Sequence, residues 1–461
     1  MKKQFIKNPV IFLLSLSLAF LAGCSQNGGG NSDVDNSKVI RVLSFTDEVP
    51  GIIDAYFKTH PNTGYRVESS IVHTTDGKYQ PVLDNFLING GKDAPDIFTT
   101  EAAFVLKYTR DDLADKVMSF EELGFDDLKS RIQNSKIADY TVQLGSDKNG
   151  NVKGLSYQST GGCFIYRRSV AKEVFGTDDP SSVCEKIGGG TGDLEKFWAA
   201  AEKCAEKGFA IVSGDGDLWH VVENSADKGW IDENGKLYID PKREKFLDYS
   251  KNLTEKGWSN GTQDWQDAWF ADMKGVGAKP VLGFFGPAWL INYTIAPNCG
   301  GSKVGEGTYG DWAVCSSPIG FFWGGTWVSV SKNTNMSSEK KAIVKDIINW
   351  ITLDPSVDGL QYKWAEGILN GFIGKKDSVA SGVVMKNANG TLDFLGGQDM
   401  FDYFVPANEY ARGDIYTQKD EAINIIWREE VRDYASGKKT REDAIYCFKN
   451  RVQLDIGIPY E

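Results

Sequence analysis

Histidine is scarce in this chain, which has three among its 461 residues: His60, His73 and His220. A His-rich metal site therefore has few ligands to draw on, and no cysteine pair stands in a CxxC or other zinc-like spacing. Walker, GxSxG and HExxH patterns are missing as well. These absences disfavour metalloenzymes, P-loop NTPases and esterase-like hydrolases, and we expect neither a metal nor a cofactor.

Positive charge is also in short supply. Lysine and arginine, 51 in all, are outnumbered by 63 acidic residues, so the formal net charge is −12. Phosphate backbones require clustered Lys and Arg side chains, so nucleic acid is excluded as the main partner. Aromatic residues are plentiful instead: 13 Trp and 18 Tyr suit interfaces and open clefts.

The apolar run near the N-terminus is short. It extends from Val10 to Ala22, is interrupted by two serines, and follows the basic residues Lys2, Lys3 and Lys7. A run of this length is too short to span a bilayer as a stable helix but suits the core of a signal peptide. We therefore expect a signal peptide over residues 1–23.

The run ends in a sequence that resembles the bacterial lipobox, Leu-Ala-Gly-Cys at residues 21–24. In that motif the chain is cut before the cysteine, which then carries fatty-acyl chains, so Cys24 is the expected lipidation site. The alternative is a short membrane anchor with an incidental cysteine. Residues 24–37, rich in Gly and Ser, are typical of a flexible tether. We expect a protein lipid-anchored at the cell membrane, on its extracytoplasmic face.

Six further cysteines follow, and disulfides are permitted outside the cytosol. The sequence cannot choose among the pairings. Nearest neighbours in the chain favour Cys184 with Cys204 and Cys299 with Cys315, and buried free thiols are the alternative.

The first hundred residues after the tether alternate between strand and helix patterns. Strands are predicted over 39–45, 65–72 and 95–99, with helices over 50–58 and 79–88 between them. This βαβαβ order points to a parallel α/β sheet, in which ligands lie beyond the carboxyl ends of the strands. Longer helices are predicted over residues 193–207, 338–352 and 420–436.

Several motifs occur in an order typical of one family. They include Ala94-Pro95-Asp96-Ile97, residues 284–289 with Gly-Pro-Ala-Trp at their end, Gly324-Gly325 before a strand, and residues 433–443. Together with the lipobox they resemble the lipid-anchored solute-binding proteins of ABC importers, in the maltose-binding-protein-like carbohydrate class. The resemblance covers most of the chain after the tether. Arg167-Arg168 and the glycines at 188–192 depart from the family pattern.

The resemblance implies an α/β, two-lobed periplasmic-binding-protein fold of type II, with the ligand cleft between lobes joined by crossing strands. Lobe 1 would comprise residues 38–158 plus 314–355, and lobe 2 residues 159–313 plus 356–461. The crossings are expected near 157–160, 314–317 and 353–357. A hinge would let the lobes close on a solute.

The function implied is capture of a solute, a sugar or oligosaccharide, and its delivery to the permease subunits of an ABC transporter. We expect a monomer that is not an enzyme. Two alternatives stay open. The first is a surface-anchored glycoside hydrolase, because the two catalytic carboxylates of such an enzyme have no fixed spacing in the sequence that could be searched for. The second is a sugar-binding adhesin without a transporter.

Acidic and aromatic residues supply the candidate ligand contacts. Asp47 and Glu48 follow the first predicted strand and either accept sugar hydroxyls or cap the helix from Pro50. Trp289 stands in the family's ligand loop, where Gly286 allows close approach. Trp265 and Trp269 are interpreted as core packing. The expected ligand-binding set is Asp47, Glu48, Thr100, Glu101, Tyr157, Trp219, Gly286, Trp289, Trp323 and Trp327.

Overall fold

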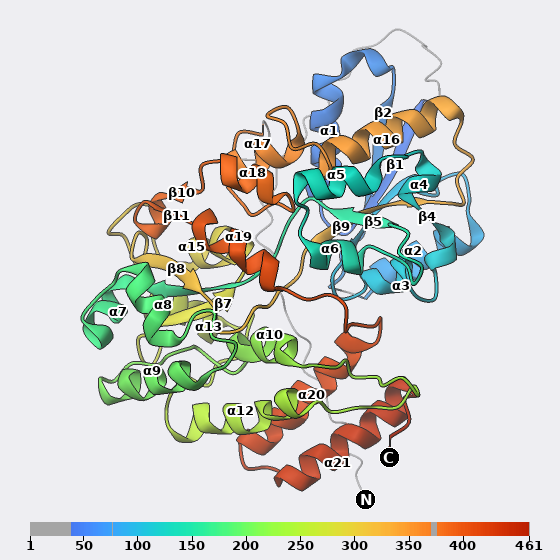
Figure 1. Ribbon diagram of the computed structural model, residues 1–461. Coiled ribbons are helices and arrows are strands. Elements are labelled where there is room, and N and C mark those ends of the chain that lie inside the picture. Colours follow the sequence, from blue (N-terminus) through green and yellow to red (C-terminus); the bar gives the residue numbers. More distant parts are fainter. Residues whose placement is uncertain (1–37, 76, 370–375, 461) are drawn as a thin grey trace, which may run out of the picture.

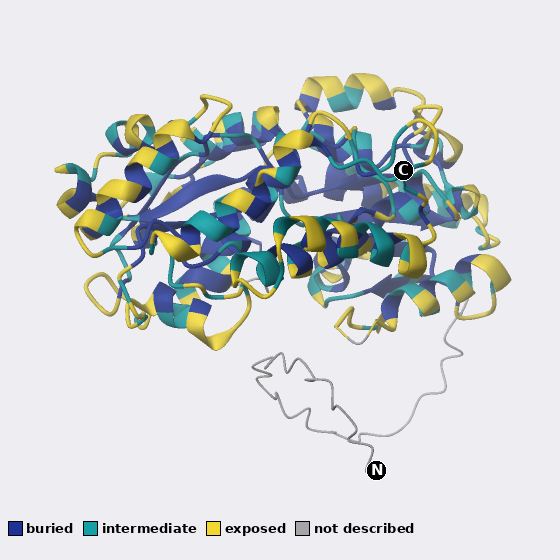
Figure 2. Cartoon of the chain, turned by 90° about the horizontal axis from the view of Figure 1, so that it is seen from below, coloured by how far each residue is buried: buried dark blue, intermediate teal, exposed yellow. Residues whose placement is uncertain are grey.

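The computed structural model describes residues 38–75, 77–369 and 376–460, which form two α/β lobes side by side (Figure 1). In each lobe a sheet lies inside and helices cover it; buried strands run through the interior, and exposed residues face outward on the helices (Figure 2). The predicted Cys24, signal peptide and tether lie outside the described residues.

The first lobe is built on a sheet with the order β2-β1-β3-β9-β4, in which β5 also pairs with β9. Strand β1 is parallel to β2 and β3, whereas β9 runs antiparallel to β3. The strands are β1 Val39–Ser44, β2 Arg66–Ile71, β3 Ile97–Glu101, β4 Val117–Met118, β5 Gly154–Ser156 and β9 Thr326–Ser331. The helices are α1 Glu48–Thr59, α2 Tyr79–Asn89, α3 Val105–Thr109, α4 Phe120–Leu123, α5 Leu128–Ser135, α6 Asp139–Leu144 and α16 Ser338–Thr352.

The second lobe has a smaller sheet, β7-β6-β8, in which both outer strands are antiparallel to β6. Its strands are β6 Cys163–Arg167, β7 Gly283–Gly286 and β8 Trp312–Ser316. The helices before β8 are α7 Arg168–Phe175, α8 Pro180–Ile187, α9 Glu195–Glu206, α10 Gly216–Ser225, α11 Pro241–Glu244, α12 Phe246–Glu255, α13 Asp267–Lys274, α14 Ala288–Leu290 and α15 Ala296–Asn298. The C-terminal helix α20 Asp420–Ala435 packs on α12, and α21 Arg441–Arg451 packs on α20.

The opening βαβαβ prediction and the three longer helices are confirmed, with ends that differ by at most a few residues. Periodicity explains this agreement: α1 buries Ile52, Ile53 and Tyr56 on one side and leaves Asp54 exposed.

Two crossing segments join the lobes, and the second begins later than expected. Residues 157–162 connect β5 to β6, and residues 317–325 connect β8 to β9. The return expected near 314–317 is wrong at its start, because Val314 and Cys315 belong to the second sheet: they pair with Ile165 and Phe164. The predicted boundary falls inside β8, and nothing in the sequence reveals that this strand pairs with β6.

The third passage is a helical layer rather than a short link. After α16 the chain forms α17 Leu360–Glu366, α18 Gly382–Asn387 and α19 Phe401–Tyr410, with the small hairpin of β10 Thr391–Leu392 and β11 Gln398–Asp399. Helix α18 packs on α5 of the first lobe, and α19 packs on β6 and β8 of the second. This layer therefore contacts both lobes.

The six cysteines of the described residues are all free, so the two predicted disulfide pairs are wrong. Sequence proximity favoured them, but Cys184 lies on α8 beside Cys315 of β8. Among the described residues, no helix is both long and apolar enough to cross a membrane.

Candidate functional site

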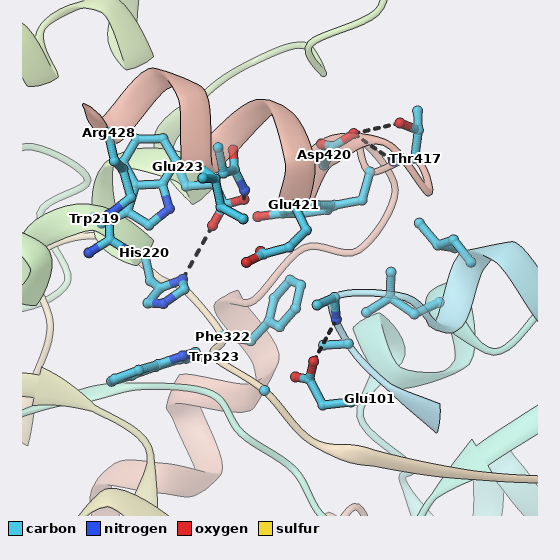
Figure 3. A pocket seen from close by; sticks show the side chains of 18 of the residues that line it. Glu101, Trp219, His220, Glu223, Phe322, Trp323, Thr417, Asp420, Glu421 and Arg428 are labelled. Carbon is cyan, nitrogen blue, oxygen red and sulfur yellow. Dashed lines mark hydrogen bonds and ion pairs between the residues drawn. The ribbon is translucent and has the colours of Figure 1, made fainter. Parts of the chain in front are cut away.

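A cavity of about 300 Å³ lies between the two lobes (Figure 3). Its first-lobe wall is formed at the end of β3 and along α3 by Glu101, Ala102, Ala103 and Leu106, with Leu144 of α6 beside them. Helix α10 and the first two turns of α20 form the opposite wall, and residues 322–324 of the second crossing lie between the two.

Aromatic rings form one side of this cavity. The Trp323 indole stacks on the His220 ring with centroids 4.7 Å apart, and the edges of Trp265 and Trp289 meet it at 5.9 and 5.0 Å. Trp289 Nε1 donates a hydrogen bond of 3.0 Å to the Trp323 carbonyl oxygen, which fixes the backbone beside Gly324. The cluster offers indole surface on which a flat apolar face can stack.

Trp265 is the most unusual member of this cluster. It lies just before α13, is 39% exposed, and has φ of +66°. A bulky residue in the left-handed region is strained, and such strain is held by surrounding structure, commonly at ligand sites. The core interpretation is confirmed for Trp269, which is buried and donates to Asp217 at 2.8 Å, but is wrong for Trp265. The two rings still touch, with centroids 5.4 Å apart, so Trp265 packs on the core through Trp269 while much of its own side chain stays exposed.

Five carboxyl groups line the cavity, and three of them accept hydrogen bonds from other side chains. Asp264 accepts hydrogen bonds of 2.6 and 2.8 Å from Arg428, while Arg432 lies at 3.3 Å; burial opposes the charge of Asp264, but these guanidinium groups outweigh it and lower its pKa. Glu223 accepts a 2.6 Å hydrogen bond from Asn424 and lies 3.3 Å from His220 Nδ1.

Asp420 is the third carboxylate with partners. Its Oδ1 accepts hydrogen bonds from the backbone N–H and the hydroxyl of Thr417, at 3.0 and 2.6 Å. Burial raises the pKa of Asp420 to about 7. Arg243, which is fully buried nearby, favours the charged form, and Glu223 opposes it.

Glu101 and Glu421 are the two remaining carboxylates, one from each lobe. Glu101 follows β3 and accepts a 3.1 Å hydrogen bond from the Ala103 N–H. Burial, with a smaller contribution from the charge of Glu421, raises the pKa of Glu101 to about 7. Glu421 stands in the first turn of α20 and remains exposed on one side; the protein around its carboxyl group and the charge of Glu223 raise its pKa. Figure 3 shows both side chains entering the same space from opposite walls.

Comparison with known proteins identifies the architecture. No protein-family model matches the sequence, and no curated protein matches it. Among solved structures, an extracellular solute-binding protein family 1 member is similar, with 19% identity, a TM-score of 0.71 and coverage of 89% of this chain and 97% of the other. The galacto-N-biose-/lacto-N-biose I-binding protein of the ABC transporter from Bifidobacterium longum, in complex with lacto-N-biose, matches with 16% identity, a TM-score of 0.65 and coverage of 92% and 98%.

A third similar structure is the ABC transporter associated binding protein from B. animalis subsp. lactis Bl-04 in complex with beta-1,6-galactobiose, with 17% identity, a TM-score of 0.60 and coverage of 92% and 99%. The chain has the two-lobed fold of the extracellular solute-binding proteins. The predicted fold class is therefore confirmed, and the cavity described above lies between the two lobes of that fold.

Three of the residues predicted for the solute cleft line the cavity: Glu101, Trp219 and Trp323. Trp219 presents little surface, since it is 1% exposed and packs against Phe246. Trp289 does not line the cavity directly; its half-buried ring lies nearly parallel to that of Trp265, 6.2 Å away, and supports Trp323.

Asp47 and Glu48 lie at the start of α1, away from the cavity lining. The capping role weighed for Asp47 is not formed, because this exposed side chain accepts no capping hydrogen bond. Glu48 instead accepts a hydrogen bond from the Tyr157 hydroxyl. Burial raises the pKa of the nearby Tyr293 phenol, and the charges of Asp377 and Glu48 add to that shift.

Four residues predicted to contact the ligand lie in the interior of the fold, so their predicted role as ligand contacts is wrong. Thr100 and Trp327 are fully buried and face each other in the pairing of β3 with β9; Trp327 Nε1 donates to the Thr141 carbonyl oxygen at 2.8 Å. Tyr157 is fully buried as well. A Cβ at Gly286 would lie 2.2 Å from Leu290 Cδ2, so this glycine allows close packing of α14 on β7 rather than approach to a ligand.

The sequence did not identify Glu421 or Trp265 as residues of the interlobe cavity. A carboxylate in the first turn of a helix is a common dipole-stabilising residue, and nothing local shows that α20 meets the end of β3 more than 300 positions earlier. A positive φ at a tryptophan leaves no sequence signal at all.

Proposed function

We propose that this chain is a substrate-binding protein that captures a sugar or oligosaccharide between its lobes and delivers it to the permease of an ABC transporter. The observation that carries the proposal is the interlobe cavity, in which indole rings and carboxylates face one space. An indole covers the apolar face of a pyranose, and carboxylates accept hydrogen bonds from its hydroxyl groups.

The named neighbours support a sugar as the solute, since two of them bind the disaccharides lacto-N-biose and beta-1,6-galactobiose. They are binding proteins, which favours capture over turnover. We infer that the protein is a monomer and that lipidation at Cys24, followed by the tether at 24–37, holds it on the extracytoplasmic face of the cell membrane. In this proposal lobe 1 comprises residues 38–158 and the chain from β9 to residue 355, and lobe 2 comprises residues 159–316 and 356–461, because β8 pairs within the second sheet.

A thermal-shift screen of the purified chain after Cys24 against mono- and oligosaccharides tests the proposal. A ligand at a hundredfold excess over its Kd adds ~2.7 kcal/mol to the free energy of unfolding, which raises the Tm measurably. Calorimetry and chromatography of the best binder should then show reversible binding without products. Products would favour the glycoside hydrolase, and a screen without any binder would overturn the proposal.

A further inference from the structure

Two carboxylates of the interlobe cavity, Glu101 and Glu421, form no salt bridge within the described parts of the chain. Five carboxyl groups and one guanidinium group line the cavity, and Arg428 is already committed to Asp264. Glu101 receives one backbone N–H. Glu421 makes no hydrogen bond or salt bridge within the described ranges; its surroundings and Glu223 raise its pKa by more than the charges of His220 and Arg428 lower it. Carboxyl groups thus outnumber the cationic groups that line the cavity.

A buried acceptor in the same wall adds to this excess. Asp420 is 4% exposed and lines the cavity, and its Oδ2 has no hydrogen-bond partner within the described parts of the chain. An unsatisfied buried carboxylate oxygen is costly unless a donor reaches it. A ligand that brings N–H donors would meet that need.

Aromatic faces border the acidic space. Trp323 and Phe322 come from the second crossing, and Trp265 from the loop before α13. A cation beside an aromatic face is attracted by the ring quadrupole, and the attraction grows when water is excluded. Carboxylates on two sides and rings on a third are the surroundings that a protonated amine prefers.

We propose that the ligand of this cavity carries a protonated amine that lies between Glu101 and Glu421, so that the solute is an amino sugar or an amine-bearing oligosaccharide rather than a neutral sugar. This inference rests on the proposed function. Glu101 belongs to the first lobe and Glu421 to the second, so closure on a neutral ligand would either bring two like charges together or require one of the two carboxyl groups to hold a proton. An ammonium group between them removes that repulsion and links recognition of its charge to closure.

The raised pKa of Glu101 fits this arrangement. Without a cation, burial and the charge of Glu421 favour its protonated form up to about pH 7. A bound ammonium group would favour the ionised form instead, so binding of an amine should release protons near neutral pH.

The test uses disaccharides in matched pairs that differ only by an amino or a hydroxyl group on one ring, with spermidine as a linear polyamine. Calorimetry should give at least tenfold tighter binding for the amine of a pair, weakening as salt is raised. Glu421→Gln and Glu101→Gln should each reduce that preference at least fivefold. Glu429→Gln is the matched control, because Glu429 lies on the same helix, exposed and paired with Arg451.

The outcomes separate the two proposals. Equal or tighter binding of the hydroxyl sugars would overturn the amine inference and leave sugar capture standing. Binding of spermidine but of no sugar would support the amine pocket and overturn sugar capture. A preference for amines that survives both Gln variants would overturn the assignment to Glu101 and Glu421, and absence of all binding would overturn both proposals.

Discussion

At the scale of single residues, the site depends on which tryptophans face the cavity and which lie in the core. Trp323 and Trp327 are four positions apart on one crossing and strand, yet the first is half-buried at the cavity and the second is fully buried. Their substitutions should therefore have separable consequences.

Trp323→Ala should weaken binding of the ligand about 30-fold. A sugar ring that covers roughly 80–100 Å² of the indole face contributes ~2 kcal/mol to the binding free energy at about 25 cal/mol per Å². The Tm of this variant should change little. Trp327→Ala should instead lower the free energy of unfolding by ~3–5 kcal/mol, because it opens a cavity in the core. Calorimetry with denaturant unfolding measures both quantities, and a reversal of the two effects would show that the cleft is wrongly placed.

Burial should also make stability depend on pH through Asp377. This side chain is 1% exposed, and burial raises its pKa to about 8, with Glu48 adding to the shift. Between about pH 4 and pH 8 the folded state therefore keeps a proton that the unfolded chain has lost, so the stability due to this group declines as pH rises.

Asp377→Asn stays neutral at every pH and keeps an acceptor for the Ser378 N–H, which lies 2.8 Å from Oδ1. The Tm advantage of the variant over the wild-type protein should grow from pH 5 to pH 8.5. The other buried acids are common to both proteins, so the difference reports on Asp377. Parallel Tm curves across this range would contradict the assignment.

At the scale of elements, the two crossing segments are packed against each other without space for a side chain. A Cβ at Gly162, in the first crossing, would lie 1.9 Å from the Phe321 ring of the second. The Gly162 N–H also donates to the Phe321 carbonyl oxygen at 2.9 Å. The two crossings, residues 157–162 and 317–325, therefore form one packed pair of segments rather than two independent linkers. This pair is called the strap.

Gly162→Ala should lower the free energy of unfolding by ~1–3 kcal/mol, because overpacking must move the Phe321 ring or the strap. Gly382→Ala is the control: its Cβ would meet its nearest neighbour, the Lys136 carbonyl oxygen, at 3.4 Å at the start of α18. Denaturant unfolding of both variants measures the effect. Equal stability of the two would mean that the strap has room to adjust.

At the scale of the whole molecule, the two lobes meet through the strap and the helical layer α17–α19, so closure is a rotation of one lobe about these contacts. Small-angle scattering should show a smaller radius of gyration once the sugar ligand saturates the protein. An unchanged profile at saturation would argue against a hinged cleft. The double variant with Glu101→Gln and Glu421→Gln lacks the two like charges that face each other across the cavity. In the absence of ligand it should therefore close more readily than the wild-type protein.

The remaining prediction at this scale concerns the attachment of the protein to the membrane. Cys24→Ser should release the protein from membranes or leave the precursor uncut, because the thiol that accepts the lipid is lost. Fractionation of cells followed by mass spectrometry of the N-terminus distinguishes these outcomes. A variant that still fractionates as processed, membrane-bound protein would refute the lipobox interpretation.

The sequence alone was enough for the elements and for the type of fold. Hydrophobic periodicity is a local property, so the strands near residues 39–45 and 95–99 and the helices at 338–352 and 420–436 could be predicted from neighbours a few positions apart. The order of motifs such as Pro95-Asp96 resembles that of the solute-binding family, and that resemblance implied the two-lobed architecture that the structural comparisons confirm.

Only the tertiary structure decided which side chains share the cavity. Glu101 and Glu421 are 320 positions apart, and they meet because the end of β3 and the start of α20 form opposite walls of one cleft. Burial made the same distinction among similar residues: Trp327 and Thr100 lie inside a sheet pairing, whereas Trp323 and Trp265 border the cavity. Such contacts depend on long-range packing of whole lobes, which no local spacing encodes.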